Sequence, residues 1–344
     1  MIMGIAVGFG DPEGTWKRYA EACKHLQIDY AVIDIISGDW LTRITAKVGV
    51  ISGLLVGPPC MNIEEYDIYM ERLYFIDKEL HIPIYPNYNE LKLYENKRYC
   101  TAWLEYHGFP IPKTVVLCHK AEAKAFISNT KFPIVIKASI GAGSSAVHIV
   151  KTKGAAKRFV SKVFGLHRLL ALGYISWVEY KKFPIKIPLI GSSLRHYMIV
   201  QEFIPIKWEW RIIKIGNSYF GHRKLLKGQY ASGSDKVGWV APPVELLDMV
   251  RDICKQGNFN SMAVDIFEST DDKYYVNECQ SMFGSYNNSQ MYIDGKPGRY
   301  IYNDGNYVFE EGYFNLYGSC LLRVENFLDI LGKASGEVTF NSNI

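Results

Sequence analysis

Residues 132–150 contain the feature that most constrains how this chain can fold. Two short β-branched runs, Ile134–Ile136 and Val147–Val150, flank a loop of small residues, and Lys137 ends the first run. Such runs around a glycine-containing loop predict a β-hairpin. Glycines let backbone N–H groups approach a phosphate closely, and a lysine ammonium supplies a point charge for it. The stretch therefore predicts either a phosphate-binding hairpin or an ordinary hairpin with a flexible tip.

The order of lysine and glycines distinguishes this stretch from two other phosphate-binding motifs. In a Walker-type P-loop the lysine follows the glycines and opens a helix. In protein kinases the lysine also follows the glycine-rich loop, and HRD and DFG motifs come downstream, neither of which occurs here. In this chain Lys137 precedes Gly141 and Gly143, and a second strand follows Ser144 and Ser145.

Length and composition indicate a folded protein of several lobes. The chain has 344 residues, of which 48% are hydrophobic and 14% aromatic, and single cores stop growing near about 250–300 residues. The net charge of +4 is spread along the chain, which suits an anionic ligand such as a nucleotide and predicts no nucleic-acid partner. Seven cysteines without CxxC spacing, and no apolar run long enough for a membrane, predict a cytoplasmic protein.

The order of elements predicts three parts. Residues 1–92 alternate strand and helix patterns, which predicts a parallel α/β domain. Its first strand begins near Gly4, and because the N-terminus lacks a basic region we expect no signal peptide. Residues 93–200 then contain the lysine hairpin, and residues 201–344 form a C-terminal lobe.

A second lysine opens a predicted helix ahead of the hairpin. The helix covers Lys97–Tyr106 and ends at Gly108, and the prolines at 110 and 112 impose an extended exit. Taken alone, Lys97 would be an ordinary surface lysine.

Polar and charged residues follow on the next strands. A buried strand, Tyr197–Pro205, runs into a bend, and Glu209 and Arg211 follow on one face of a further strand. The later cluster Arg223–Lys224 runs into a Ser/Gly loop, as an anionic intermediate would need, although a solvated turn is the common alternative.

Three oxygen-bearing side chains on two strands predict a metal site. Asp265 lies within an apolar strand, where a buried carboxylate is costly without a cation or donor. Glu278 and Gln280 are two residues apart and share a face, whereas parity places Asn277 on the other face. Hard oxygen ligands of this kind suit Mg²⁺. The alternative is a pair of strand ends with solvated acids.

Together these segments resemble the ATP-grasp superfamily, in its order and approximate spacing, from Lys97 to Gly284. The nearest likeness is to the glutathione synthetase or ribosomal-protein modification ligase branch. The resemblance implies an α/β protein with the ATP-grasp fold, in which an N-terminal parallel α/β domain precedes two α+β lobes that clamp ATP. Where the family usually has Asn, this chain has Gln280, which displaces the amide oxygen by one methylene.

The resemblance also implies roles for individual residues. The phosphates would be held by Lys97, Lys137, Gly141, Gly143, Ser144 and Ser145. The adenine edge would meet the backbone of Gln201, Glu202, Phe203 and Ile204, and the ribose would meet Glu209. An acylphosphate would be steadied by Arg211, with Arg223 and Lys224 behind it. Mg²⁺ would bind Asp265 and Glu278, with Gln280 as a further candidate.

The implied activity is an ATP-dependent ligation of a small-molecule carboxylate to an amine, through an acylphosphate, with release of ADP and phosphate. An ATP-grasp kinase, which would phosphorylate a hydroxyl, and a non-catalytic nucleotide-binding protein remain open, with a sugar-nucleotide glycosyltransferase further off. The two metal-site carboxylates should repel each other without metal. Replacing Asp265 by Asn is therefore expected to leave the metal-free protein at least as stable.

Overall fold

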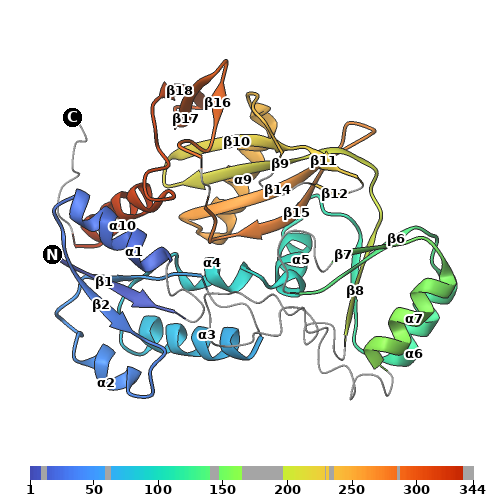
Figure 1. The fold of residues 1–344 in the computed structure, drawn as a ribbon, viewed down its shortest axis with the longest axis horizontal. Helices are drawn as coiled ribbons and strands as arrows, with labels where there is room; N and C mark the ends of the chain where they lie inside the picture. The colour runs from blue at the N-terminus through green and yellow to red at the C-terminus, as the bar shows by residue number, and fades with distance from the viewer. Residues whose placement is uncertain are drawn as a thin grey trace.

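The computed structural model describes residues 1–8, 14–58, 63–139, 147–164, 197–228, 230–231, 236–284 and 287–335. Three sheets of four or more strands organise the described residues (Figure 1). A small parallel sheet lies at the N-terminal end, a large antiparallel sheet occupies the middle, and a second antiparallel sheet with two helices lies at the far side.

The N-terminal sheet confirms the expected parallel α/β domain. Its strand order is β2-β1-β3-β4, and every neighbouring pair is parallel. The strands are β1 (Ile2–Val7), β2 (Asp29–Asp34), β3 (Gly53–Leu55) and β4 (Ile84–Tyr85). The helices in this part of the chain are α1 (Thr15–His25), α2 (Trp40–Thr45), α3 (Ile63–Lys78) and α4 (Tyr88–Leu93).

The last helix, α10 (Cys320–Ser335), returns to this N-terminal sheet. Its residues Val324 and Phe327 pack with Met3, Ile5 and Leu55 in one apolar core. Helices α10 and α1 consequently lie side by side at the left of Figure 1. A segment more than 250 residues away in sequence thus completes the N-terminal core, while the expected division at residues 92 and 200 stays a prediction.

The predicted lysine hairpin is present in the second antiparallel sheet, whose order is β5-β8-β6-β7. Strands β6 (Ile134–Lys137) and β7 (Val147–Val150) pair antiparallel, with Lys137 opposite Val147. The other strands are β5 (Thr114–Leu117) and β8 (Met198–Glu202). Helices α6 (Lys120–Asn129) and α7 (Lys153–Phe164) share an apolar core with this sheet. The loop residues Gly141, Gly143, Ser144 and Ser145 lie outside the described residues.

Helix α5 (Lys97–Tyr106) begins and ends where the sequence predicts. The N–H of Phe109 donates to the Leu104 carbonyl, and the N–H of Gly108 donates to that of Glu105. This is the Schellman pattern, which requires a left-handed residue after the helix, and Gly108 has a φ of +75°. Asn96 caps the other end by accepting a bond from the Tyr99 N–H.

The large sheet has the order β15-β14-β9-β10-β17-β16, with β13 paired to β10 and β18 to β17. Its strands are β9 (Ile206–Ile215), β10 (Ser218–Lys224), β13 (Val237–Gly238), β14 (Ser261–Ser269), β15 (Tyr274–Gln280), β16 (Tyr292–Ile293), β17 (Lys296–Asn303) and β18 (Asn306–Glu311). Two further short strands, β11 (Leu226–Lys227) and β12 (Tyr230–Ala231), pair with each other. Helix α9 (Val244–Gly257) packs its apolar side on one face of the large sheet, against Trp210, Val264 and Cys279.

The sequence expectations about membrane-spanning segments and cysteines concern these elements. No helix in the described part of the chain is both long and apolar enough to cross a membrane. The described cysteines, Cys23, Cys100, Cys118, Cys254, Cys279 and Cys320, are free thiols.

The packing of α10 on the N-terminal sheet leads to a stability prediction. A Cβ at Gly53 would lie 2.5 Å from the ring of the buried Phe327, so Gly53→Ala should overpack this core by about 1–3 kcal/mol. Urea unfolding measures the loss. Gly38→Ala is the matched control, because nothing lies within 4 Å of its added Cβ. If α10 packs as described, Phe327→Leu should recover part of the loss, and strict additivity of the two substitutions would contradict the contact.

Candidate functional site

The face of the large sheet opposite α9 carries a cluster of buried charges. Glu209 and Arg211 alternate along β9, and Asp265 of β14 lies directly opposite Arg211. Lys224 of β10 lies opposite Glu209 on the other side. Because alternate residues of a strand share a face, these side chains point to one side of the sheet. Each is buried or nearly so, which makes their mutual pairing obligatory.

Asp265 is the centre of this cluster. Its Oδ1 accepts a hydrogen bond from Arg211 Nε at 2.8 Å, and its Oδ2 accepts from Arg211 Nη2 at 2.8 Å and from Lys224 Nζ at 2.5 Å. Arg211 Nη2 also donates to Gln280 Oε1 at 3.2 Å. Burial alone would raise the pKa of Asp265, but the attraction of Arg211 and then of Lys224 lowers it well below its usual range. The carboxylate is therefore ionised at neutral pH.

Glu209 extends the cluster towards the lysine hairpin. Its Oε1 accepts from Lys224 Nζ at 2.7 Å, and its Oε2 accepts from Asn277 Nδ2 at 2.8 Å. The Oδ1 of Asn277 in turn accepts from Lys137 Nζ at 2.7 Å. One amide thus connects the carboxylate of the large sheet to the lysine of β6.

The position of Asn277 corrects the expectation from strand parity. The pairing of β14 with β15 shifts between Asp265 and Ile266: Asp265 lies opposite Glu278, whereas Ile266 lies opposite Val276. Asn277 is therefore the extra residue of a β-bulge. The bulge turns both Asn277 and Glu278 to the face of Asp265, so the parity argument that excluded Asn277 was wrong.

Lys97 connects the same two parts of the chain from helix α5. Its Nζ lies 2.9 Å from Glu278 Oε1 and 3.8 Å from Glu95 Oε2. It also donates to the carbonyl of Ser139, just after β6, at 3.5 Å. Burial alone would lower the pKa of Lys97, but Glu278 and then Glu95 raise it above its ordinary value. The sequence-predicted Lys97, Lys137, Glu209 and Glu278 therefore do come together.

Lys137 differs from the other cations of the cluster in its partners. Its side chain is buried, its hydrogen-bond acceptor is the neutral amide of Asn277, and the Phe267 ring lies 5.8 Å away. No carboxylate of the described residues forms an ion pair with it. Burial, and then repulsion from Lys97, lowers the pKa of Lys137 to about 8. This is the charge balance expected of a site that receives an anion.

Arg223 does not join Arg211 and Lys224, contrary to the sequence expectation. It lies opposite Trp210 in the β9–β10 pairing, and its guanidinium lies 4.0 Å from the ring centre of Trp208 and 4.7 Å from that of Trp210. Both indole N–H groups donate to Glu268 Oε2 at 2.8 Å. Because neighbouring strand residues alternate in face, Arg223 belongs to the α9 side of the sheet.

The expected adenine-binding bend keeps its place between the two antiparallel sheets. Gln201 and Glu202 end β8, and Phe203 and Ile204 lead into β9. The two polar side chains tie β8 to the neighbouring segment: Gln201 Nε2 donates to Thr114 Oγ1, and Glu202 Oε1 accepts from the Lys113 N–H. The adenine expectation concerned backbone groups and stays a prediction. The basic segment 174–195 lies outside the described residues.

The sequence patterns did not indicate His222, which lies beside this cluster. His222 lies opposite Arg211 on β10, and its Nδ1 lies 2.9 Å from the Gln290 carbonyl oxygen. Burial lowers the pKa of His222 to about 4, so the ring is neutral at pH 7. A neutral ring therefore lies opposite Arg211. The one indication in the sequence is that His222 is two residues before Lys224 and so shares its face of a strand.

The three expected metal ligands lie together, but each already has a cationic partner. Asp265 binds Arg211 and Lys224, Gln280 binds Arg211, and Glu278 pairs with Lys97. Among the described residues no group of three or more His, Cys, Asp and Glu side chains could hold a metal. Two carboxylates and an amide on one face still suit Mg²⁺, which keeps several waters and takes phosphate oxygens. Such a metal would need oxygen ligands in addition to these three side chains.

Comparisons with known proteins establish the fold. No protein-family model matches the sequence. The α-aminoadipate–LysW ligase LysX of Sulfurisphaera tokodaii is 23% identical over 191 residues, which are 54% of this chain and 58% of LysX. The match thus spans little more than half of that relative's length.

Two solved structures extend the likeness. The D-alanine–D-alanine ligase of Bacillus anthracis superposes with a TM-score of 0.57 at 14% identity, covering 97% of this chain and 99% of that one. A RimK-domain ATP-grasp protein of Sphaerobacter thermophilus superposes with a TM-score of 0.51 at 16% identity, covering 81% and 90%. The chain has the ATP-grasp fold. At these identities the likeness concerns the fold, and the activity must be argued from the site.

Burial of Lys137 in the ATP-grasp fold leads to a pH prediction. Its folded pKa of about 8 lies below the ordinary value of 10.5, so the unfolded chain binds more protons between these values. Lys137 therefore makes the free energy of unfolding of wild type rise with pH in this range. Any stability advantage of Lys137→Met over wild type should shrink by about 3 kcal/mol between pH 7 and pH 10.5.

Urea unfolding at several pH values measures this difference. Lys255→Met, at an exposed lysine of α9, is the matched control for the loss of one positive charge. A difference between wild type and Lys137→Met that stays constant from pH 7 to pH 10.5 would contradict the buried, charge-repelled lysine.

The pairing of Asp265 reverses the stability expected for its substitution. Asp265→Asn would leave Arg211 and Lys224 buried with less negative charge, so we now expect a loss of about 3–5 kcal/mol at pH 7. The pKa of Asp265 is lowered, so wild type keeps this contribution above the ordinary value of 3.8 and loses it as pH falls through the folded pKa. Urea unfolding at pH 7 tests this. Asp329→Asn, at an exposed residue of α10, is the control, and equal stability of the two variants would count against the described ion pairs.

Proposed function

We propose that this chain is an ATP-dependent ligase that joins a carboxylate to an amine and releases ADP and phosphate. The observation that carries the proposal is Lys137, a buried lysine beside Lys97 whose described partner is an amide. A phosphate would supply the negative charge that Lys137 lacks among its described partners. The ATP-grasp fold supports a nucleotide as its source, and LysX and the D-alanine–D-alanine ligase are named as ligases.

The proposed reaction has two steps. A substrate carboxylate oxygen attacks the γ-phosphorus of ATP, forming an acylphosphate and releasing ADP. The amine nitrogen then attacks the acyl carbon, the phosphate leaves, and the nitrogen loses a proton as the amide forms. Both steps build negative charge on phosphate oxygens, so fixed cations are the main contribution a protein can make.

The side chains of the cluster would divide this work between them. Lys97 and Lys137 would hold the phosphates, because they project from α5 and β6 towards the edge of the large sheet. Arg211 would steady the charge of the acylphosphate, since Asp265 fixes the orientation of its guanidinium through two hydrogen bonds. Lys224 would act through Asp265 and Glu209, and Glu209 would meet the ribose. Arg223 is left out, because it lies on the other face.

Mg²⁺ would be held by Asp265 and Glu278, with Gln280 as a third candidate, and when bound it would neutralise charge on the phosphates. Because these residues need other oxygen ligands, we expect Mg²⁺ without nucleotide to leave the melting temperature unchanged. ATP with Mg²⁺ should raise it, as any ligand of the native state does. Stabilisation of the nucleotide-free protein by millimolar Mg²⁺ alone would contradict this arrangement.

A phosphate-release screen tests the function itself. Pooled carboxylates are crossed with pooled amines in the presence of Mg²⁺ and ATP, and both ADP and free phosphate are measured. We expect release that depends on both pools, its loss in Lys137→Met, and its retention in Lys255→Met. ADP without free phosphate would show a kinase instead, and wild-type affinity for ATP in folded Lys137→Met would overturn the site.

A further inference from the structure

The positive charge of this protein is concentrated in residues 107–164, the lobe that contains β5, β6, β7, α6 and α7. This corrects the expectation that the charge is spread along the chain. Residues 107–164 contain ten Lys and Arg residues and a single acid, Glu122. Since the whole chain carries a net charge of +4, the remaining residues together are negative. Nine of these cations are exposed: Lys113, Lys120, Lys124, Lys131, Lys151, Lys153, Lys157, Arg158 and Lys162.

The fold gathers these cations on the outer side of the lobe. Helices α6 and α7 turn Ala123, Ile127, Ala156 and Val160 into the core against the β5-β8-β6-β7 sheet. Their remaining faces are exposed and carry most of the lysines. In Figure 1 both helices lie at the end of the molecule away from the N-terminal sheet. We call this surface the basic face; it lies apart from the buried cluster around Asp265.

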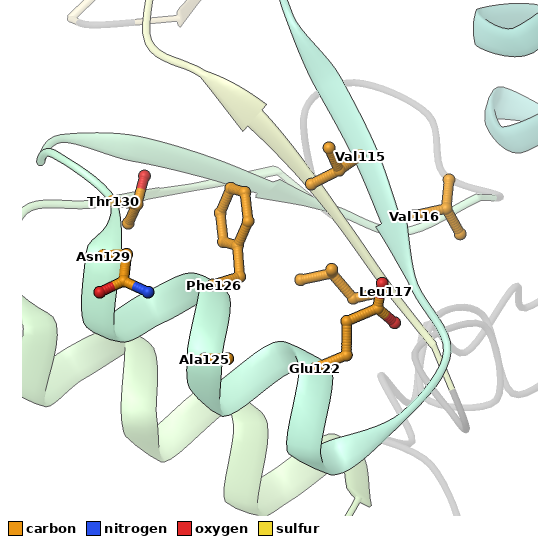
Figure 2. A pocket seen from close by; sticks show the side chains of 8 residues that line it. All are labelled: Val115, Val116, Leu117, Glu122, Ala125, Phe126, Asn129 and Thr130. Atoms are coloured by element: carbon orange, nitrogen blue, oxygen red, sulfur yellow. The ribbon is translucent and has the colours of Figure 1, made fainter.

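An apolar groove lies next to the basic face. It is bounded by β5 and α6 and has a volume of about 680 Å³. Its lining is Val115, Val116, Leu117, Glu122, Ala125, Phe126, Asn129 and Thr130. Figure 2 shows the ring of Phe126 between the helix and the strand, with Glu122 at one end and Asn129 and Thr130 at the other.

The strand that borders the groove also has an open side. In the described part of the chain β5 pairs only with β8. The Glu202 N–H donates to the Lys113 carbonyl, and Lys113 lies opposite Glu202 in the same register as Thr114 opposite Gln201. Because hydrogen bonding alternates along an antiparallel pair, the N–H groups of Thr114 and Val116 point away from β8. An extended peptide could therefore add to this edge.

We propose that the basic face and its groove bind an acidic, extended segment of a partner protein. The edge of β5 would supply backbone hydrogen bonds, the groove would take apolar side chains, and lysines of the basic face would pair with carboxylates. Alternation along a strand would send carboxylates to one side and apolar side chains to the other. Because Glu122 is acidic, the partner segment should place an apolar or basic residue at that end of the groove.

Two other anionic partners fit the surface less well. Single-stranded nucleic acid binds through exposed aromatic rings, but Phe126, Phe132 and Phe159 pack against the lobe's own core. A membrane surface needs apolar side chains that can insert, and no described residue between 107 and 164 is an exposed large hydrophobic one. The combination of groove, strand edge and charge favours a polypeptide.

The test measures binding by the full chain without ATP, so its outcome is independent of the ligase reaction. The probe is a fluorescein-labelled peptide of alternating Glu and Val, followed by fluorescence anisotropy at low salt. We expect Lys157→Glu with Arg158→Glu to weaken binding about tenfold or more. Glu122→Lys should strengthen it, and Val116→Pro, which removes an outward N–H, should weaken it.

Matched controls keep the result interpretable. Lys17→Glu with Lys255→Glu reverses two exposed lysines elsewhere and should leave peptide binding unchanged. The melting temperature of Val116→Pro is measured first, and the charge variants carry the test if that variant is unstable. Failure of wild type to bind the peptide, or equal loss in the Lys17/Lys255 control, would overturn the proposal. Tighter binding of a single-stranded oligonucleotide or of anionic vesicles, lost on the same α7 reversal, would also overturn it.

Discussion

The ion pairs of Asp265 with Arg211 and Lys224 determine how the large sheet can be built. Removing these charges from water costs several kcal/mol per ion unless each has partners, so β9, β10 and β14 must bring them to one face in register. The β9–β14 and β9–β10 pairings do so by placing Arg211 opposite Asp265 and Lys224 opposite Glu209. The opposite face is then free to be apolar, and α9 covers it.

The same network leaves Lys137 beside it without a carboxylate partner among the described residues. Asp265 and Glu209 together engage Arg211 and Lys224, while the bulge brings the neutral Asn277 between Glu209 and Lys137. An acid at that position would neutralise Lys137 and compete with an incoming phosphate. An amide instead orients the ammonium and leaves its charge available. Lys97 of α5 and Lys137 of β6 then both contact residues of the edge strand β15.

Sequence patterns predicted the parts of this molecule that depend on local signals. Helix α5 was predicted with its bounds because Gly108 ends it and the prolines at 110 and 112 follow. The bulge at Asn277 could not be predicted, since an extra residue in one strand leaves no local pattern and reverses parity beyond it. The packing of α10 on the N-terminal sheet is likewise a long-range contact. The ion pairs of Asp265 with Arg211 and Lys224 also join residues far apart in sequence.

The two groups of cations differ in how salt should act on them, and this separates their roles. Exposed charges on the basic face are screened over about 8–10 Å at ordinary ionic strength, so a partner held there would dissociate as salt rises. Lys137 and Lys97 are enclosed by protein, where screening is weak and each charge acts at short range. A macromolecule can reach only the first group and a small anion is needed for the second. The basic face would therefore attract its proposed partner over a distance, whereas the buried pair would respond to the proposed nucleotide.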